Sequence, residues 1–251
     1  MNRYLEPTAI LDFDHPSIQR LVAERGFRDI PERERIGAIY AFVRDEIAFG
    51  YNEDDDLPAS RVLADGFGQC NTKSALLMAL LRASGIPCRF HGATVDKALQ
   101  KGVVSGVFYA IAPKSILHGY AEVLFEGRFV PLEGVILDAS YLDGLRARFP
   151  EERGAFLGYG AGTDNLAAPD NEWRGEPTYV QRTGIDADFG TYDAPDAFYA
   201  ERGTNLSGLR AFVFKRFVRH VMNRKVETIR EGASTPCMPR PEDLVRRARH
   251  C

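Results

Sequence analysis

The sequence has no long apolar segment and few cysteines. No run approaches the ~20 apolar residues that span a bilayer, and residues 1–14 have no apolar core of the kind found in secretion signals. Only four cysteines occur among 251 residues, namely Cys70, Cys88, Cys237 and Cys251. Four are too few for a disulfide framework in a chain of this length. We therefore expect a cytoplasmic protein with free thiols and no membrane partner.

A dominant charge of one sign is also lacking. The net charge is −3, and contents of 27% charged and 45% apolar residues exclude disordered, collagen-like and coiled-coil chains. The charge is uneven, however, because residues 201–251 carry a net +7 and residues 1–200 a net −10. A basic segment of this kind can bind nucleic acid. Docking on the acidic remainder of the chain is the simpler interpretation, so we do not expect a nucleic-acid partner.

An unusually apolar segment follows a glycine-rich turn. The pattern predicts a helix from Cys70 or Asn71 to Arg82. Its middle, Ala75 to Leu81, is apolar on nearly every side, which is typical of a helix buried in a core. Gly85 predicts its end, because glycine adopts the left-handed conformation that terminates helices.

Four later segments have the β-branched and aromatic pattern of strands: Pro87–Gly92, Val103–Ala110, Ile116–Phe125 and Arg128–Leu132. The last two flank Glu126-Gly127 and predict a β-hairpin. A further helix is expected after Pro31. The acidic run Glu53–Asp56 lacks the alternating ligand spacing and central glycine of a calcium loop, so it is expected to be a solvated turn.

The second half of the chain has a different composition. Residues 149–200 are rich in glycine, proline and aromatics without a sustained period, which indicates an irregular cap. Apolar residues at helical spacing from Leu209 to about Arg230 predict a basic amphipathic helix, and the last twenty residues predict a loop and a short helix. Residues 150–200 carry a net −7. If they roof a cleft, they favour a cationic substrate, unless the basic helix neutralises them.

Cys70 is the first candidate for chemistry, because it stands where the glycine-rich turn becomes the buried helix. The positive end of a helix and its unpaired amides lower the pKa of a thiol, and the thiolate is the nucleophilic form. The same amides can stabilise an oxyanion formed beside the sulfur. The alternative interpretation is that Cys70 is a small buried apolar residue.

A cysteine nucleophile needs a base, and His118 is the strongest of five histidines because it lies in a predicted strand. His91, on the strand after the cysteine helix, is its competitor. If the hairpin turn is Glu126-Gly127, then Glu133 lies one diagonal from His118 on the same sheet face and can orient its ring. Asp138 remains the alternative acid, since a one-residue bulge would reverse the register.

A metal site is a further alternative. Cys88 and His91 have the Cys-x-x-His spacing of zinc ligands and could join Cys70 and His118 around one ion. No second Cys-x-x-Cys pair supports this arrangement, and Cys88 in an apolar strand is more simply a core residue. We therefore predict no metal and no other cofactor.

Four linked motifs resemble the transglutaminase-like superfamily, which has a papain-like core. They are Gly68-Gln69-Cys70, the helix end Leu80–Arg89, the strand His118–Val123 and the segment Phe129–Glu133. In that family a Gly-x-Cys opens a helix, a His-x-Trp-x-Glu-Val strand carries the base, and a following strand ends in the acid. The resemblance covers roughly residues 30–140.

The resemblance implies an α+β cysteine-protease-like fold in which the cysteine helix packs on an antiparallel sheet. It implies Cys70 as nucleophile, His118 as base and Glu133 as the orienting acid. We expect residues 1–148 to form this core with N-terminal helices. Residues 149–251 would add the cap and the basic helix, packed on the core as one domain.

The expected activity is that of a cysteine-dependent hydrolase, amidase-like or peptidase-like, that forms an acyl-enzyme thioester on a peptide, amide or thioester substrate. An acyltransferase and a catalytically inactive binding module are the alternatives. Tyr120 and Phe129 stand where the family has tryptophan, and Glu133 stands where it has aspartate. The extra methylene of Glu133 shifts its carboxylate relative to the family's acid.

Overall fold

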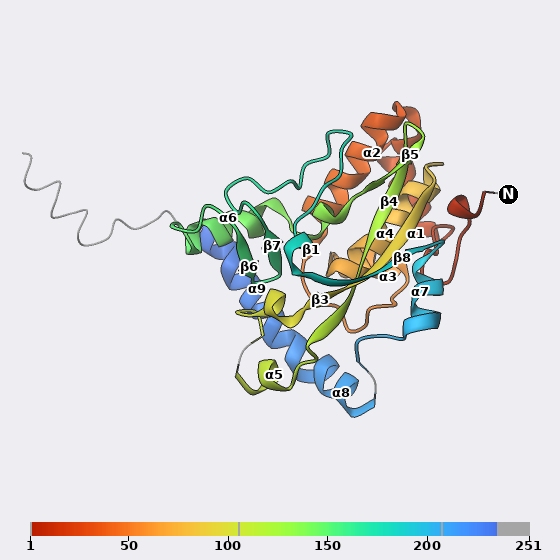
Figure 1. Cartoon of the computed structure of the whole chain (residues 1–251). Coiled ribbons are helices and arrows are strands. Elements are labelled where there is room, and N and C mark those ends of the chain that lie inside the picture. The colour runs from red at the N-terminus through yellow and green to blue at the C-terminus, as the bar shows by residue number, and fades with distance from the viewer. Residues whose placement is uncertain (1, 105, 207, 235–251) are drawn as a thin grey trace, which may run out of the picture.

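A curved antiparallel sheet forms one side of the molecule, and helices cover one of its faces (Figure 1). The computed structural model describes residues 2–104, 106–206 and 208–234. The predicted loop and short helix of the last twenty residues lie outside these ranges. Within them, no helix is both long and apolar enough to cross a bilayer.

The main sheet has four strands in the order β5-β4-β3-β8, each antiparallel to its neighbour. Its strands are β3 (Cys88–Asp96), β4 (Ser115–Phe125), β5 (Arg128–Pro131) and β8 (Ile185–Tyr192). Two small sheets accompany it: the parallel pair β1 (Ala48–Phe49) and β2 (Phe67–Gly68), and the antiparallel pair β6 (Phe156–Gly158) and β7 (Ala161–Thr163).

Nine α-helices occur in the described ranges: α1 (Pro16–Glu24), α2 (Glu32–Ala41), α3 (Ala59–Asp65), α4 (Cys70–Ala83), α5 (Gly106–Ile111), α6 (Ala139–Arg148), α7 (Pro195–Arg202), α8 (Gly208–Val213) and α9 (Arg219–Ser234). Short 3-10 turns lie at Arg3–Leu5, Phe27–Asp29, Lys97–Gln100, Glu133–Ile136 and Arg182–Gly184. Two π-helical turns, Phe42–Glu46 and Phe214–Val218, continue α2 and join α8 to α9.

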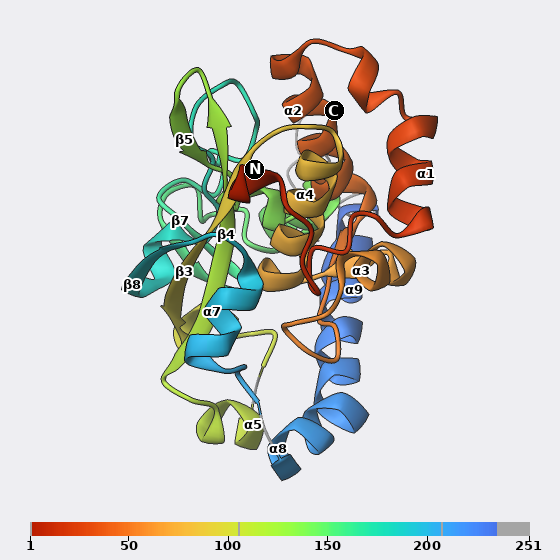
Figure 2. The ribbon, with the colours of Figure 1, turned by 90° about the vertical axis from the view of Figure 1, so that its right-hand side faces the viewer.

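Helix α4 is the centre of the core, as its composition predicts. Every residue from Asn71 to Ala83 is buried. Figure 2 shows α4 between the sheet on one side and α1 and α3 on the other. A helix covered on two sides needs apolar residues around its whole circumference, which explains the run Ala75–Leu81. Gly85, with φ of 79°, directs the chain away from the helix end.

The hairpin of β4 and β5 has the predicted register. Phe125 pairs with Arg128, and the ladder continues to the pair of Glu122 and Pro131. Both turn residues, Glu126 and Gly127, have positive φ, as a two-residue turn of this hand requires. The fold class inferred from the resemblance is confirmed: it is α+β, with the cysteine helix packed on an antiparallel sheet.

Two sequence-based expectations were wrong. The segment Val103–Ala110 is no strand, because Gly106 adopts a left-handed conformation (φ 61°) and the chain then turns into the short helix α5. The cap is irregular only in part: β6 and β7 pair within it, and longer elements begin after residue 184. Beyond it, β8 adds an edge strand to the main sheet and α7 follows. The acidic, half-exposed sequence of β8 conceals the strand pattern, because an edge strand needs little apolar burial.

The basic amphipathic helix forms as predicted and docks on the body of the protein. Its last part, α9, packs against α6, where Gly144 allows close approach. A Cβ atom at Gly144 would lie 2.0 Å from the backbone oxygen of Ile229. Lys215, in the π-helical turn before α9, forms an ion pair with Asp54. For the described part of the chain, the basic segment therefore docks on the protein's own acidic surface.

The contact at Gly144 yields a stability prediction. Gly144→Ala should lower the free energy of unfolding by about 1–3 kcal/mol, because helix α9 must move away from α6 to admit the methyl group. Urea denaturation would measure this change. Gly232→Ala on α9 is the matched control, since nothing lies within 4 Å of a Cβ atom there. It should leave stability unchanged or raise it slightly, and an equal loss in both variants would contradict the packing argument.

Candidate active site

Cys70 is the first residue of α4 and is half-buried. The turn before it is held in place by Gln69, whose backbone amide donates to Thr72 Oγ1 (3.0 Å) and whose Oε1 accepts from the amide of Asn52 (2.8 Å). The first amides of a helix have no acceptor within it. The Cys70 thiol therefore stands at the positive end of α4, beside backbone donors that can bind a developing negative charge.

His118 and Glu133 meet beside this cysteine. His118 is fully buried on β4, and its Nε2 lies 3.3 Å from Oε1 of Glu133. The Cys70 thiol lies close enough to the same ring to raise the pKa of His118. The structure thus brings together the three side chains predicted from the sequence, although they come from α4, β4 and the turn after β5.

The cap supports the Glu133 carboxylate. The amide of Val180 donates to Oε2 (2.6 Å), and the amide of Gln181 lies 3.0 Å from Oε2 and 3.1 Å from Oε1. Thr178 holds this segment against β5 through its amide, which donates to the carbonyl of Pro131 (3.0 Å). Two amide donors stabilise an ionised carboxylate in a buried place. They also position a glutamate whose side chain is one methylene longer than the family's aspartate.

The electrostatics of the site favour a protonated His118. Burial alone would disfavour the charged ring, but the neighbouring Cys70 and Glu133 outweigh it and raise the pKa of His118 to about 10. At neutral pH the ring is therefore stabilised as imidazolium.

His91, the competing histidine, has both ring nitrogens occupied. Nδ1 contacts Oε1 of Glu122 and Nε2 contacts Oδ1 of Asp188, each at 2.8 Å. Burial lowers the pKa of His91, but the two carboxylates outweigh it and raise the pKa. Its ring stacks on Tyr120 with centroids 4.6 Å apart. We assign His91 a structural role.

The zinc hypothesis fails on geometry. Cys88 and His91 stand three positions apart on β3, so their side chains point to opposite faces of the sheet. Cys88 is buried, and its thiol donates to the carbonyl of Met78 in α4 (3.6 Å). Within the described ranges, no group of three or more His, Cys, Asp or Glu side chains could hold a metal ion.

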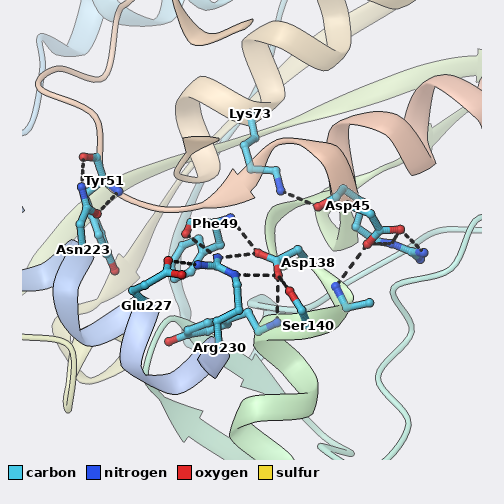
Figure 3. A network of polar contacts seen from close by, with 12 residues as sticks. Asp45, Phe49, Tyr51, Lys73, Asp138, Ser140, Asn223, Glu227 and Arg230 are labelled. Atoms are coloured by element: carbon cyan, nitrogen blue, oxygen red, sulfur yellow. Dashed lines mark hydrogen bonds and ion pairs between the residues drawn. The ribbon is translucent and has the colours of Figure 1, made fainter. Parts of the chain in front are cut away.

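Asp138, the alternative acid, has another function (Figure 3). It caps α6 by accepting from the amide of Tyr141 (2.8 Å), and it accepts from the amide of Phe49 in β1 (2.8 Å). It also pairs with Arg230 of α9 at 2.9 Å. Burial raises the pKa of Asp138, but these partners outweigh it and lower the pKa to about 2. Asp138 therefore ties three elements together.

Lys73 is a buried cation that sequence reasoning missed, three positions after Cys70. Its Nζ donates to the carbonyl of Arg44 (3.0 Å), and the side chain is fully buried (Figure 3). Burial lowers the pKa of Lys73 to about 7, although the negative charges of Asp138 and Asp45 oppose the shift. A single lysine in an apolar helix was the signal available in the sequence.

The acidic run Glu53–Asp56 is more than the expected solvated turn. Asp55 accepts from Nδ2 of Asn71 (3.2 Å), the residue after Cys70. It also accepts from the amide (3.1 Å) and the side chain (2.9 Å) of Asn205, in the segment before α8. Asn205 Oδ1 in turn accepts from the amide of Leu117, which precedes His118 (2.6 Å). This network joins the elements that carry Cys70 and His118 to the segment before α8, and no local pattern in the sequence indicated it.

A cavity of about 350 Å³ opens beside Cys70. Its walls come from the cysteine end of α4, from β3 and β4, from α5, and from the helical segment after Asn205. Its acidic lining residues belong to Glu53–Asp55. Among the described residues, the acids of 150–200 line no part of it, so the condition under which they would favour a cationic substrate is not met.

A nucleophilic cysteine at the start of a buried helix, with histidine on an adjoining antiparallel strand, is the arrangement of papain-like cysteine enzymes. Residues 24–134 match the model of the transglutaminase-like superfamily. The resemblance seen in the four sequence motifs is therefore confirmed over this part of the chain. The match supports a cysteine-dependent enzyme in general terms.

The other comparisons add little. One solved structure, described as a candidate cysteine protease from Cytophaga hutchinsonii, is similar with 14% identity and a TM-score of 0.45. The similarity covers 77% of this chain and 47% of that one, so this chain spans about half the length of the structure it matches. No curated protein matches the chain significantly.

Proposed function

We propose that the protein is a cysteine-dependent hydrolase that cleaves an amide or thioester through an acyl-enzyme on Cys70. One observation carries the proposal: Cys70, His118 and Glu133, distant in sequence, lie together beside a cavity. A cysteine and a histidine that only fill the core would not have to lie beside each other, a carboxylate and a cavity. The match of residues 24–134 to the transglutaminase-like superfamily supports the same chemistry.

In the first half of the reaction, the Cys70 sulfur attacks the substrate carbonyl carbon, and His118 holds the thiol proton. Glu133 orients the ring and stabilises the imidazolium. The carbonyl oxygen gains negative charge, which the first amides of α4 stabilise. The bond to the leaving group then breaks, His118 gives its proton to the departing amine or thiolate, and the acyl group remains on sulfur as a thioester.

In the second half, water attacks the thioester and His118 takes its proton. The carbon–sulfur bond breaks, a carboxylic acid leaves, and the proton returns to the Cys70 sulfur. An acyltransferase would pass the same acyl group to an amine. Reaction in ¹⁸O-labelled water with an added amine distinguishes the two, because hydrolysis yields labelled acid and transfer yields an amide. Exclusive formation of the amide would contradict hydrolysis as the function.

The role of Glu133 can be tested through the pH dependence of the reaction. Glu133 raises the pKa of His118, so Glu133→Gln should shift the alkaline limb of the kcat/KM profile to lower pH. It should also reduce kcat/KM by roughly 10- to 100-fold, as the loss of a carboxylate partner of a histidine does at other sites.

Glu122→Gln is the matched control, because Glu122 on β4 is also the carboxylate partner of a histidine, His91 (2.8 Å), but is not part of the proposed triad. It should leave both the position of the alkaline limb and kcat/KM unchanged. An unshifted limb in Glu133→Gln, or an equal shift in both variants, would contradict the assignment of Glu133.

A further inference from the structure

The cavity beside Cys70 has predominantly apolar walls. Aliphatic and aromatic side chains from five different segments form it, including Leu99, Val104, Ile116, Val213, Phe214 and Met222. Such residues offer no hydrogen bonds to a ligand. A polar or charged group placed among them would lose its hydration without compensation.

The polar residues at the Cys70 end of the cavity have partners within the protein. Gln69 Nε2 donates to the carbonyl of Asp54 (3.3 Å). Asn71 Nδ2 donates to Asp55 and to the carbonyl of Leu117, each at 3.2 Å. Asn205 Nδ2 also donates to the Asp55 carboxylate (2.9 Å). What remains for a ligand beyond Cys70 is mostly apolar surface, with the unpaired side-chain oxygens of Asn71 and Gln181 as the buried acceptors.

The entrance is apolar as well. Ile111 of α5 and Leu209 of α8 line the cavity, yet 66% and 78% of their surfaces are exposed. Helices α5 and α8 lie next to each other at one end of the molecule in both ribbon views (Figures 1 and 2). The cavity therefore opens between these two helices, and an extended apolar group could enter with its reactive end toward Cys70.

From these observations we infer that the cavity is an acyl-binding site that takes an unbranched aliphatic acyl group. An apolar cavity of about 150 Å³ binds benzene, so one of about 350 Å³ accommodates roughly 12 carbon atoms. The inference deepens the proposed function, because it names the acyl half of the substrate that Cys70 would accept. A peptide fits less well, since its amide groups would find few partners along these walls.

A chain-length series tests the inference through activity. Acyl thioesters from acetyl to dodecanoyl, each below its micelle concentration, should show kcat/KM rising about three- to fourfold for each added methylene until the cavity is full. Val213→Trp fills the cavity and should remove this preference while acetyl turnover persists. Phe212→Trp is the matched control, because the neighbouring Phe212 is 60% exposed and outside the lining. It should retain the preference.

Binding by the inactive Cys70→Ala protein tests the inference independently of turnover. Calorimetry should show that decanoate binds at least tenfold more tightly than acetate, and that Val213→Trp in the same background removes the difference. Leu209→Gln, an exposed change at the entrance that should not disturb folding, should weaken decanoate several-fold. These three results would support the acyl-binding site even if Cys70 proved catalytically inert.

Other outcomes would contradict the acyl-binding site without contradicting the hydrolase. If wild-type protein hydrolyses acetyl and decanoyl thioesters equally well and Cys70→Ala binds decanoate no better than acetate, the acyl site is wrong while the hydrolase stands. Unchanged decanoate binding in both Val213→Trp and Leu209→Gln would overturn it too. The unfolding midpoint of each variant shows whether a loss reflects the cavity or the fold.

Discussion

Replacing Cys70 by alanine is expected to reduce turnover of an amide or thioester by roughly 10⁴- to 10⁶-fold, the loss seen when a covalent nucleophile is removed. No other group on the described surface of the cavity has the position to replace a sulfur at the start of α4. The same change should remove alkylation by iodoacetamide at this position. Peptide mapping by mass spectrometry measures the labelling of each cysteine separately.

Cys88 provides an internal control in the wild-type protein. It is buried, its thiol donates to the carbonyl of Met78, and burial raises its pKa to about 11, although nearby Arg82 opposes the shift. Its thiol should therefore resist alkylation in the folded protein and react only after unfolding. Full turnover by Cys70→Ala, or equal labelling of Cys70 and Cys88 in the folded state, would exclude the proposed mechanism.

Asp138→Asn should lower the free energy of unfolding by about 2–4 kcal/mol, because it leaves a largely buried guanidinium with only the exposed carboxylate of Glu227 as ion-pair partner. The side chains of Asp138 and Arg230 are only 3% and 17% exposed. Asparagine keeps the shape and one acceptor oxygen, which can still cap α6. The amide of Phe49 then faces an NH2 group and loses its acceptor, which adds to the cost of losing the charge. Urea denaturation at neutral pH is the measurement.

The effect should depend on pH in one direction. The folded-state pKa of Asp138, about 2, lies below its ordinary value of 3.8. Its stabilisation is therefore complete above about pH 4 and is lost as the pH falls toward 2. The gap between wild type and Asp138→Asn should close over that interval.

Asp143→Asn on the same helix is the matched control, because the Asp143 side chain is 62% exposed. Its effect should stay within about 0.5 kcal/mol. A difference between wild type and Asp138→Asn that persists unchanged at pH 2 would show that the ion pair is not its source.

Local patterns were enough to predict the elements that carry the candidate site. The apolar circumference of α4, the left-handed stop at Gly85 and the hairpin at Glu126-Gly127 each depend on residues close in sequence. The register of β4 and β5 then placed Glu133 on the same face as His118, because side chains alternate with a period of two.

Features that depend on distant partners could not be predicted in this way. Strand β8 is defined by pairing with β3 rather than by its own apolar pattern, and α5 forms because Gly106 interrupts an apparently strand-like run. Asn205 reaches Asp55 and Leu117 only after the chain has returned from α7. Nothing in the composition near Asn205 distinguishes it from an ordinary loop asparagine.

The two amides that hold Glu133 lie 47 and 48 residues after it, in a segment outside the matched stretch 24–134. A fragment trimmed to that stretch would contain all three side chains of the proposed triad, but it would lack both amide donors to the Glu133 carboxylate. The smallest fragment that keeps the candidate site intact is therefore larger than residues 24–134, the stretch that matches the family model. Excision or grafting of this core into another scaffold must carry residues 178–181 along with it.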